Sequence, residues 1–324
     1  MFGSAPAWLW AAFIAIVVLA LFVDFAVLKK QGSHAVSVPE AIRWSIVWVA
    51  LSLAFNVFLW WAYVQESGTV VAHTKALEFL TGYLVEKSLA VDNIFVFLMI
   101  FTYFSVPAAF QKRVLMIGII LAMVLRAIMI LIGGWLINEF HWILYVFGAF
   151  LVITGIKMWT ANDEEGDLES NPALKMLRRF MTVSPHYDGE KFFTLHNGAK
   201  VATPLLLVCT LVGITDVIFA VDSIPAIFAI TSDPFIVLTS NIFAILGLRA
   251  MFFLLAAMAA KFHLLNYGLA VVLVFIGTKM LVVYWGIKIP ALVSLAVVVG
   301  VLAVTMVWSV KTAPKIGGSK TVQD

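Results

Sequence analysis

The sequence has a single cysteine, Cys209, and few charged residues. One cysteine cannot form a disulfide within the chain, and without a CxxC pair the chain has no thiol redox centre of its own. Cys209 is interpreted as an apolar packing residue. Only 12% of the residues are charged, against about 25% in soluble domains, whereas 63% are hydrophobic. This composition excludes an ordinary soluble domain and predicts a protein of the lipid bilayer.

The apolar stretches also lack the motifs of common enzymes. They contain no nucleophile with a nearby histidine, no haem-ligand pair and no phosphate-binding glycine loop. We therefore expect no catalytic activity and no bound cofactor, and nothing in the sequence indicates a nucleic-acid partner.

Apolar stretches of about 20 residues, the length that crosses a bilayer, recur along the whole chain. The sequence thus predicts an all-α polytopic membrane protein with about nine transmembrane helices. The stretches are Trp8 to Leu28, Ala41 to Val64, Leu77 to Tyr103, Val114 to Ile137, Trp142 to Trp159, Ala202 to Ile230, Phe235 to Ala260, Tyr267 to Trp285 and Ile289 to Val310.

The basic residues outside these stretches alternate between the two sides of the membrane. Nearly all of them fall in the loops of one side, and only Lys75 and Lys288 fall on the other. Because basic loops stay in the cytoplasm, this pattern places the N-terminus outside and the C-terminus inside. Nothing basic precedes the first stretch and Lys29 and Lys30 follow it, so it is interpreted as a retained helix rather than a signal peptide.

Three short landmarks occur twice in the same order, which indicates a duplication. Each copy holds three apolar stretches, so the second copy enters the membrane from the opposite side and the repeats are inverted, as in many secondary transporters. The landmarks are EKSLAVDN at Glu86 to Asn93 with DVIFAVDS at Asp216 to Ser223, LRA at Leu125 to Ala127 with Leu248 to Ala250, and GIKM at Gly155 to Met158 with GTKM at Gly277 to Met280.

The repeats divide the chain into five parts. The polar part carries an acidic run at Asp163 to Glu169, an expected surface helix around Leu174 and Leu177, and a hairpin turn at Asn197-Gly198. A solvated connector is the favoured interpretation of this loop, with a regulatory role as the alternative. The parts are two N-terminal helices in 1–72, the first repeat in 73–160, the cytoplasmic loop in 161–201, the second repeat in 202–286, and the last helix with its tail in 287–324.

Four carboxylates lie well inside the predicted spans: Glu86, Asp92, Asp216 and Asp222. An ionised carboxylate at membrane depth costs about 2.5–3.5 kcal/mol, so each needs a partner. The two acids of each repeat are six residues apart, about 9 Å along a helix and on different faces. Either the helix is locally unwound, as Pro225 suggests for the second repeat, or the acids form two stations on a path.

The neighbouring polar residues Asn93 and Ser223, with Asn241 as a further candidate, supply only oxygen donors of the hard type, and the six histidines lie in loops or at helix ends. Mn²⁺, Mg²⁺ or Ca²⁺ therefore fits better than copper or zinc. The predicted metal ligands are Glu86, Asp92, Asn93, Asp216, Asp222 and Ser223.

Basic residues inside the spans offer an alternative interpretation. Arg126, Arg249 and Lys87 form a supporting charge network that could neutralise the acids and leave a static set of ion pairs. Pairing does not exclude transport, because the arginines could also hold or release the acids in alternate states. Asp24 and Glu78, which lie nearer a membrane surface, are interpreted as interfacial residues.

The motifs YLVEKSLAVDNIFVF at Tyr83 to Phe97 and DVIFAVDSIPAIFAIT at Asp216 to Thr231 resemble the paired signatures of the TerC family, and nearly the whole chain resembles its Alx-like branch. The resemblance implies an inner-membrane protein linked to tellurite resistance, alkaline pH response and manganese homeostasis. Its motif acids match Glu86, Asp92, Asp216 and Asp222. Gly213 departs from the pattern, because the family usually has a glutamate there.

The resemblance implies that Alx-like members export Mn²⁺, so the leading hypothesis is an exporter of divalent metal cations, with the cation and membrane lipid as partners and protein partners left open. Tellurite is an anion that a carboxylate site would repel, so a tellurite phenotype would be indirect. One alternative is a membrane stress-response module that acts through partner proteins without transport. Another is an exporter of a small organic cation.

Overall fold

The structure is a computed structural model that describes residues 5–31, 37–140, 142–160, 183–196, 199–256, 264–283 and 289–312. Most of these residues are helical, which confirms the expectation of an all-α membrane protein. The elements are α1 (Ala7–Gln31), α2 (Val38–Ser67), α3 (Thr69–Tyr103), α4 (Ala108–Glu139), α5 (Ile143–Thr160), β1 (Phe193–His196), β2 (Ala199–Ala202), α7 (Pro204–Phe228), α8 (Pro234–Leu246), α9 (Leu248–Ala256), α10 (Leu265–Val282) and α11 (Ala291–Thr312).

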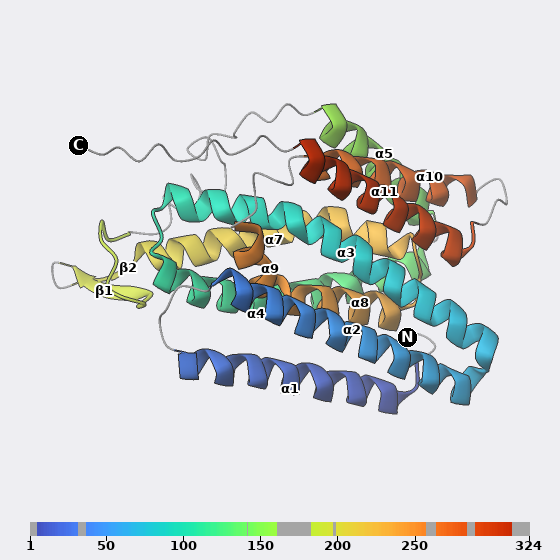
Figure 1. The fold of residues 1–324 in the computed structure, drawn as a ribbon, viewed down its shortest axis with the longest axis horizontal. Helices are drawn as coiled ribbons and strands as arrows, with labels where there is room; N and C mark the ends of the chain where they lie inside the picture. Colours follow the sequence, from blue (N-terminus) through green and yellow to red (C-terminus); the bar gives the residue numbers. More distant parts are fainter. Residues whose placement is uncertain are drawn as a thin grey trace.

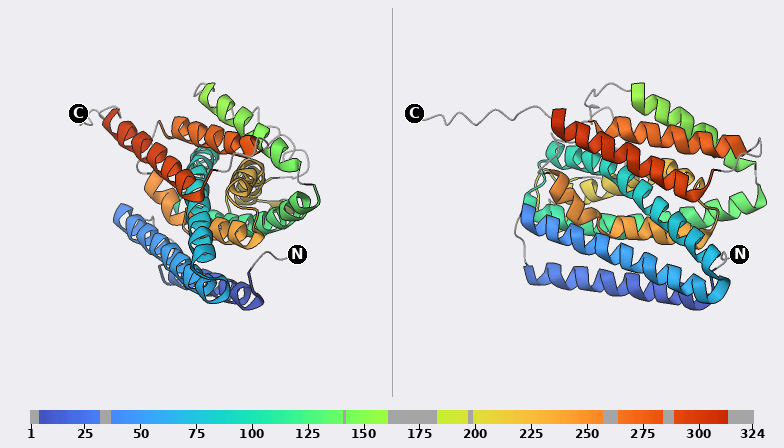
Figure 2. Two further views of the ribbon diagram at one scale, coloured as in Figure 1. Left: turned by 90° about the vertical axis from the view of Figure 1, so that its right-hand side faces the viewer. Right: turned by 45° about the vertical axis from the view of Figure 1, so that its right-hand side comes forward.

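The helices form an elongated bundle (Figure 1). α1 begins at one end of the bundle, and α11 ends at the opposite end, where the two strands also lie (Figure 1). Seen from the end, α1 and α2 lie on one side and α5, α10 and α11 on the other, with α3 between them (Figure 2). α8 is buried along its whole length, so the second repeat supplies part of the interior.

Among the described residues, five helices are long and apolar enough to cross a membrane, and a sixth span results if α8 and α9 are taken together, with a bend of 45° between them. α5 and α10 contain shorter apolar segments. α3 has 35 residues and carries the buried acid Glu86. The five are Ala7–Ala26, Val38–Ser67, Ala108–Ile137, Pro204–Phe228 and Val293–Thr312.

Local sequence explains where several helices begin. Gly68 separates α2 from α3 with a φ of 86°, a conformation that side chains with a Cβ rarely adopt. Asp233 caps α8, because its carboxylate accepts a hydrogen bond from the backbone N–H of Phe235. Proline at the first helical position, where no N–H is needed, starts both α7 and α8.

The two sequence repeats pack across each other. α3 of the first repeat lies along α8 of the second, and α4 of the first lies along α7 of the second. Glycines allow both contacts: a Cβ on Gly82 would lie 2.8 Å from Ser240 Oγ, and one on Gly118 would lie 3.2 Å from a methyl group of Val212. The interior is therefore shared between the repeats.

α5 and α10, which carry the third landmark of each repeat, pack against each other closely. A Cβ on Gly277 would lie 2.6 Å from the carbonyl oxygen of Gly148, and one on Gly155 would lie 2.8 Å from that of Ala270. Small residues at such contacts let two helices approach in a membrane. The earlier residue of α5 contacts the later residue of α10, and the later residue of α5 contacts the earlier one, so the two helices run antiparallel.

An aromatic cluster attaches α1 and α2 to the repeats. The rings of Phe55 on α2 and Phe243 on α8 stack with centroids 4.4 Å apart, and Phe79 on α3 lies 5.5 Å from Phe55. Phe13 of α1 contacts Phe235 edge-on at 6.1 Å. These contacts fix the two N-terminal helices beside α3 and α8.

The described part of the polar loop contains the hairpin. β1 and β2 pair antiparallel on either side of residues 197–198, with Phe193 opposite Ala202. Asp188 accepts hydrogen bonds from Lys191 and Thr194, which lower the pKa of its carboxyl group. The expected acidic run at 163–169 and the surface helix around 174–177 lie outside the described residues.

Candidate functional site

A buried arginine lies where the two repeats meet. The Arg126 guanidinium of α4 binds Asp216 of α7 through two contacts, Nη2 to Oδ1 at 3.0 Å and Nε to Oδ2 at 3.3 Å. Its Nη1 forms an ion pair with Glu86 Oε1 of α3. Both acids and the arginine are almost completely buried, with side-chain exposures between 1% and 5%. The cluster of Glu86, Arg126 and Asp216 is called the central triad below.

The central triad joins three helices and both repeats, because α3 and α4 belong to the first repeat and α7 to the second. Arg126 also lies 3.5 Å from Ser223 Oγ, two helical turns beyond Asp216 on α7. Two carboxylates and one guanidinium leave one negative charge when all three are ionised. A buried site with unbalanced negative charge attracts a cation.

Several buried polar atoms around α3 and α8 have no hydrogen-bond partner among the described residues. Glu86 Oε2 is one, and both side-chain amide atoms of Asn241 are others. Asn241 is fully buried, and Asn93 is 4% exposed. Because an unsatisfied buried polar group is costly, such atoms are candidate ligands for an ion or water.

The other two predicted acids lie on the same helices as the triad. Asp92 is on α3 and Asp222 is on α7, but their side chains lie outside the described residues. α3 and α7 are helical throughout, and α7 continues past Pro225 to Phe228. The local unwinding that Pro225 suggested is therefore wrong for the described backbone. A proline in the last turn leaves most of the helix ladder intact. The remaining alternative is that the two acids of each helix form two separate cation-binding positions along a path.

Gly213, where the resemblance in sequence led us to expect a glutamate, faces α4. A Cβ there would lie 2.6 Å from Leu121 Cδ2, so Leu121 occupies the space that a larger side chain would need. Close to this contact, Asp216 lines a small cavity together with Val212 and Leu248. Leu248, the first residue of the second LRA landmark, therefore lies near the triad acid Asp216.

The second LRA arginine has a different partner. Arg249 Nη2 of α9 lies 2.5 Å from Asp24 Oδ1 of α1, and the two side chains are 9% and 13% exposed. Asp24, which was expected from the sequence to lie near a membrane surface, forms a largely buried ion pair within the protein. α1 lies outside both repeats, so this pair has no counterpart in the first repeat.

Lys87, the third cation of the predicted network, contacts backbone instead of a described carboxylate. Its Nζ donates to the Ala244 carbonyl of α8 at 3.0 Å. Ala244 lies in the last turn of α8, where carbonyls lack partners within the helix and the helix dipole is negative. A Cβ on Gly247 would lie 2.7 Å from this Nζ. Lys87 thus stabilises the bend between α8 and α9.

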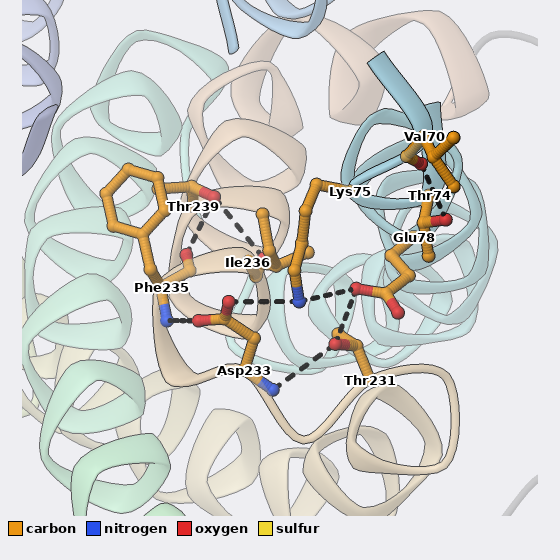
Figure 3. A network of polar contacts seen from close by, with 9 residues as sticks. All are labelled: Val70, Thr74, Lys75, Glu78, Thr231, Asp233, Phe235, Ile236 and Thr239. Atoms are coloured by element: carbon orange, nitrogen blue, oxygen red, sulfur yellow. Dashed lines mark hydrogen bonds and ion pairs between the residues drawn. The ribbon is translucent and has the colours of Figure 1, made fainter. Parts of the chain in front are cut away.

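A second network of charges joins the first part of α3 to the start of α8 (Figure 3). Lys75 lies between Glu78 at 3.2 Å and Asp233 at 3.0 Å. Thr231 donates to Glu78 at 2.7 Å, so α3 is tied to the connection between α7 and α8. Glu78, which was expected to lie near a membrane surface, is only 15% exposed because it is packed within this network.

Sequence reasoning missed Asp233 in this network. The only local signal was the Asp-Pro pair before an apolar run, which marks a helix start and not an ion pair. Within the described residues, no three His, Cys, Asp or Glu side chains gather to hold a metal ion. Cys209 is buried on α7.

Comparisons with known proteins identify the family of this chain. The Integral membrane protein TerC family matches residues 71–315. The chain is 56% identical over 299 residues to the "Putative membrane-bound redox modulator Alx" of Escherichia coli K12, covering 92% of this chain and 93% of that protein. It is 50% identical to the Alx protein of Photorhabdus laumondii, covering 93% and 94%.

An uncharacterized membrane protein of Myxococcus xanthus, STKORF319, is also 50% identical, covering 93% of this chain and 91% of that protein. No solved structure matches the chain significantly. The family match covers most of the chain, including every residue of the central triad. The protein therefore belongs to the TerC family of integral membrane proteins.

Proposed function

We propose that the protein is a transporter that exports divalent metal cations, Mn²⁺ foremost, through a carboxylate site between two inverted repeats. The single observation that carries this proposal is the central triad, in which two buried acids from different repeats share one arginine. The excess negative charge, the unpartnered Glu86 Oε2 and the buried Asn241 amide offer oxygen ligands to a hard cation.

The packing of the helices supports the inverted repeats. α3 against α8 and α7 against α4 are equivalent contacts once the repeats are exchanged, and the antiparallel pair of α5 and α10 joins equivalent helices. Such exchange contacts are expected around a two-fold axis in the membrane plane. Two units of this kind can alternate between inward-facing and outward-facing shapes around one site.

The nine-span topology is part of the same proposal, with α8 and α9 as one bent span and α3, α5 and α10 as further spans. The opposite positions of the start of α1 and the end of α11 support an odd number of crossings (Figure 1). With the basic residues on the cytoplasmic side, the N-terminus lies outside the inner membrane and the C-terminus inside. The network of Lys75, Glu78 and Asp233 then faces outward, and the hairpin faces the cytoplasm.

The test is the manganese content of cells that lack their own manganese exporters, measured by elemental analysis at equal expression. The wild-type protein is expected to lower cell manganese, and Asp92→Asn and Asp222→Asn to abolish that effect, because each substitution keeps the shape but removes a ligand charge. Glu190→Gln, which alters an acid with a 40% exposed side chain, is the matched control. If the Asp92 and Asp222 variants both lower manganese as the wild type does, the proposal is wrong.

The name of the Alx relatives, membrane-bound redox modulator, favours a second candidate, a membrane module that modulates redox stress without transporting metal. Cys209 is the only cysteine of the chain and is buried. Under this candidate, Cys209→Ala would remove a redox phenotype while manganese content stays unchanged. Under metal export, the same substitution leaves manganese export intact.

A further inference from the structure

The two LRA arginines hold equivalent places in the sequence repeats but serve different acids. Arg126 lies between Glu86 and Asp216, whereas Arg249 is held by Asp24 of α1. Glu86 and Asp216 hold equivalent places in the two repeats, as Arg126 and Arg249 do. If the two repeats exchanged conformations, Arg249 would therefore contact the same two triad acids. The inference below rests on the proposed transport function and its inverted repeats.

We propose that Arg249 is a tethered cation that competes with the transported metal for the triad acids, and that Asp24 holds it away while metal is bound. With Arg249 on Asp24, the triad keeps one negative charge and attracts the metal. When Arg249 reaches Glu86 and Asp216, two guanidinium groups neutralise the two acids and the metal leaves. Asp24 and Arg249 are therefore positioning residues that set the metal affinity of the site.

An acceptor atom for this movement is present, and the residue next to Arg249 lies near Asp216. Leu248, the residue before Arg249, lines the same small cavity as Asp216. Glu86 Oε2 has no partner among the described residues, so the triad can accept a further donor. An arginine can bind two carboxylates at once, which a lysine does less well.

A bend in the helix lies just before Arg249. The helix bends by 45° between α8 and α9, whereas α4 passes through the equivalent position, Val124, without a break. Lys87 holds the bent shape through the Ala244 carbonyl, and Gly247 leaves room for its ammonium group. In the proposed exchange this bend straightens as Arg249 leaves Asp24, so the bend is the two-state element that the exchange requires.

The holding site for Arg249 is made by elements outside the repeats. Asp24 belongs to α1, and Glu40, in the first turn of α2, also interacts electrostatically with Arg249. Lys112 on α4 is the neighbouring positive charge. Two acids thus face Arg249 here, and neutralising Asp24 would weaken its hold.

The experiment measures Mn²⁺ binding to purified full-length protein by titration calorimetry. Asp24→Asn is expected to raise the Kd about tenfold or more, because the released Arg249 competes for the triad acids. The double variant Asp24→Asn with Arg249→Gln is expected to return the Kd to the wild-type value, which a purely structural ion pair would not do. Thermal unfolding of each variant shows whether it is folded.

The single variant Arg249→Gln provides an independent test, in which Mn²⁺ binding and the rate of Mn²⁺ transport into proteoliposomes are measured. It is expected to bind Mn²⁺ at least as tightly as the wild type but to transport it at least about tenfold more slowly, because the displacing cation is gone. Wild-type affinity in Asp24→Asn, or wild-type turnover in Arg249→Gln, would overturn the inference. A wild-type protein that neither binds nor moves Mn²⁺ would instead overturn the transport function itself.

Discussion

Arg126 and Arg249 occur in the same three-residue landmark, yet the protein surrounds them differently. Arg126 is sealed between two repeats and serves two acids with a side chain only 1% exposed. Arg249 lies next to a bend, forms its ion pair with an acid of a helix outside the repeats, and is 9% exposed. This contrast matches the proposal that Arg126 stays in the central triad while Arg249 moves between two sites. Duplicated sequence does not give duplicated electrostatics, because α1 has no second copy.

The largest effect is expected from Arg126→Met. The substitution leaves Glu86 and Asp216 buried without a counter-charge, and removing one partner of a buried ion pair costs about 3–5 kcal/mol. The protein should unfold at a much lower temperature in detergent or fail to fold. The measurement is the thermal unfolding midpoint together with the yield of monodisperse protein.

A neutral version of the same cluster provides the control. The triple variant Arg126→Met with Glu86→Gln and Asp216→Asn has no uncompensated charge and should recover most of the lost stability. If Arg126→Met alone unfolds at the wild-type temperature, the central triad is not the buried ion-pair cluster described above.

Arg249→Met should destabilise the protein less, by about 2 kcal/mol. Asp24 loses its partner, but its side chain is 13% exposed and can relax toward water, unlike the triad acids. The unfolding midpoint should fall between those of Arg126→Met and the wild type. Equal losses for the two arginines would remove the contrast between a fixed and a movable cation.

Lys75→Met should have a smaller effect still, about 1 kcal/mol. Glu78 keeps its hydrogen bond from Thr231, and Asp233 keeps the one from the Phe235 backbone (Figure 3). A double-mutant cycle between Lys75→Met and Asp233→Asn, followed by thermal unfolding, measures the coupling between α3 and α8. Strict additivity of the two losses would mean that the network does not tie these helices together.

Arg113→Gln should change stability least, by at most about 0.5 kcal/mol. Arg113 and Glu190 are 3.1 Å apart, but each side chain is 40% exposed, and exposed ion pairs contribute little in water. The unfolding midpoint should match that of the wild type within error, and 1 M salt should remove any difference. A large loss here would show that the polar loop is part of the folding core.

The amino-acid sequence by itself determined the membrane class, the all-α fold and the TerC family. A chain with few charges and long apolar stretches is stable only in a lipid bilayer. Inside lipid, apolar segments of this length satisfy all their backbone hydrogen bonds by forming helices. The sequence also marked Glu86, Asp216, Arg126 and Arg249 as unusual, since charges at membrane depth are rare without a purpose.

Only the tertiary structure decided which charges meet. Arg126 and Asp216 are 90 residues apart, Arg249 and Asp24 are 225 apart, and Thr231 and Glu78 are 153 apart. Local patterns do not encode such pairs, because the pairing depends on which helices pack together. The bend before Arg249 was also invisible in the sequence, since Gly247 adopts an ordinary φ of −86° and matters for the space it leaves to Lys87. Helix packing therefore placed the arginines of two identical motifs beside different acids.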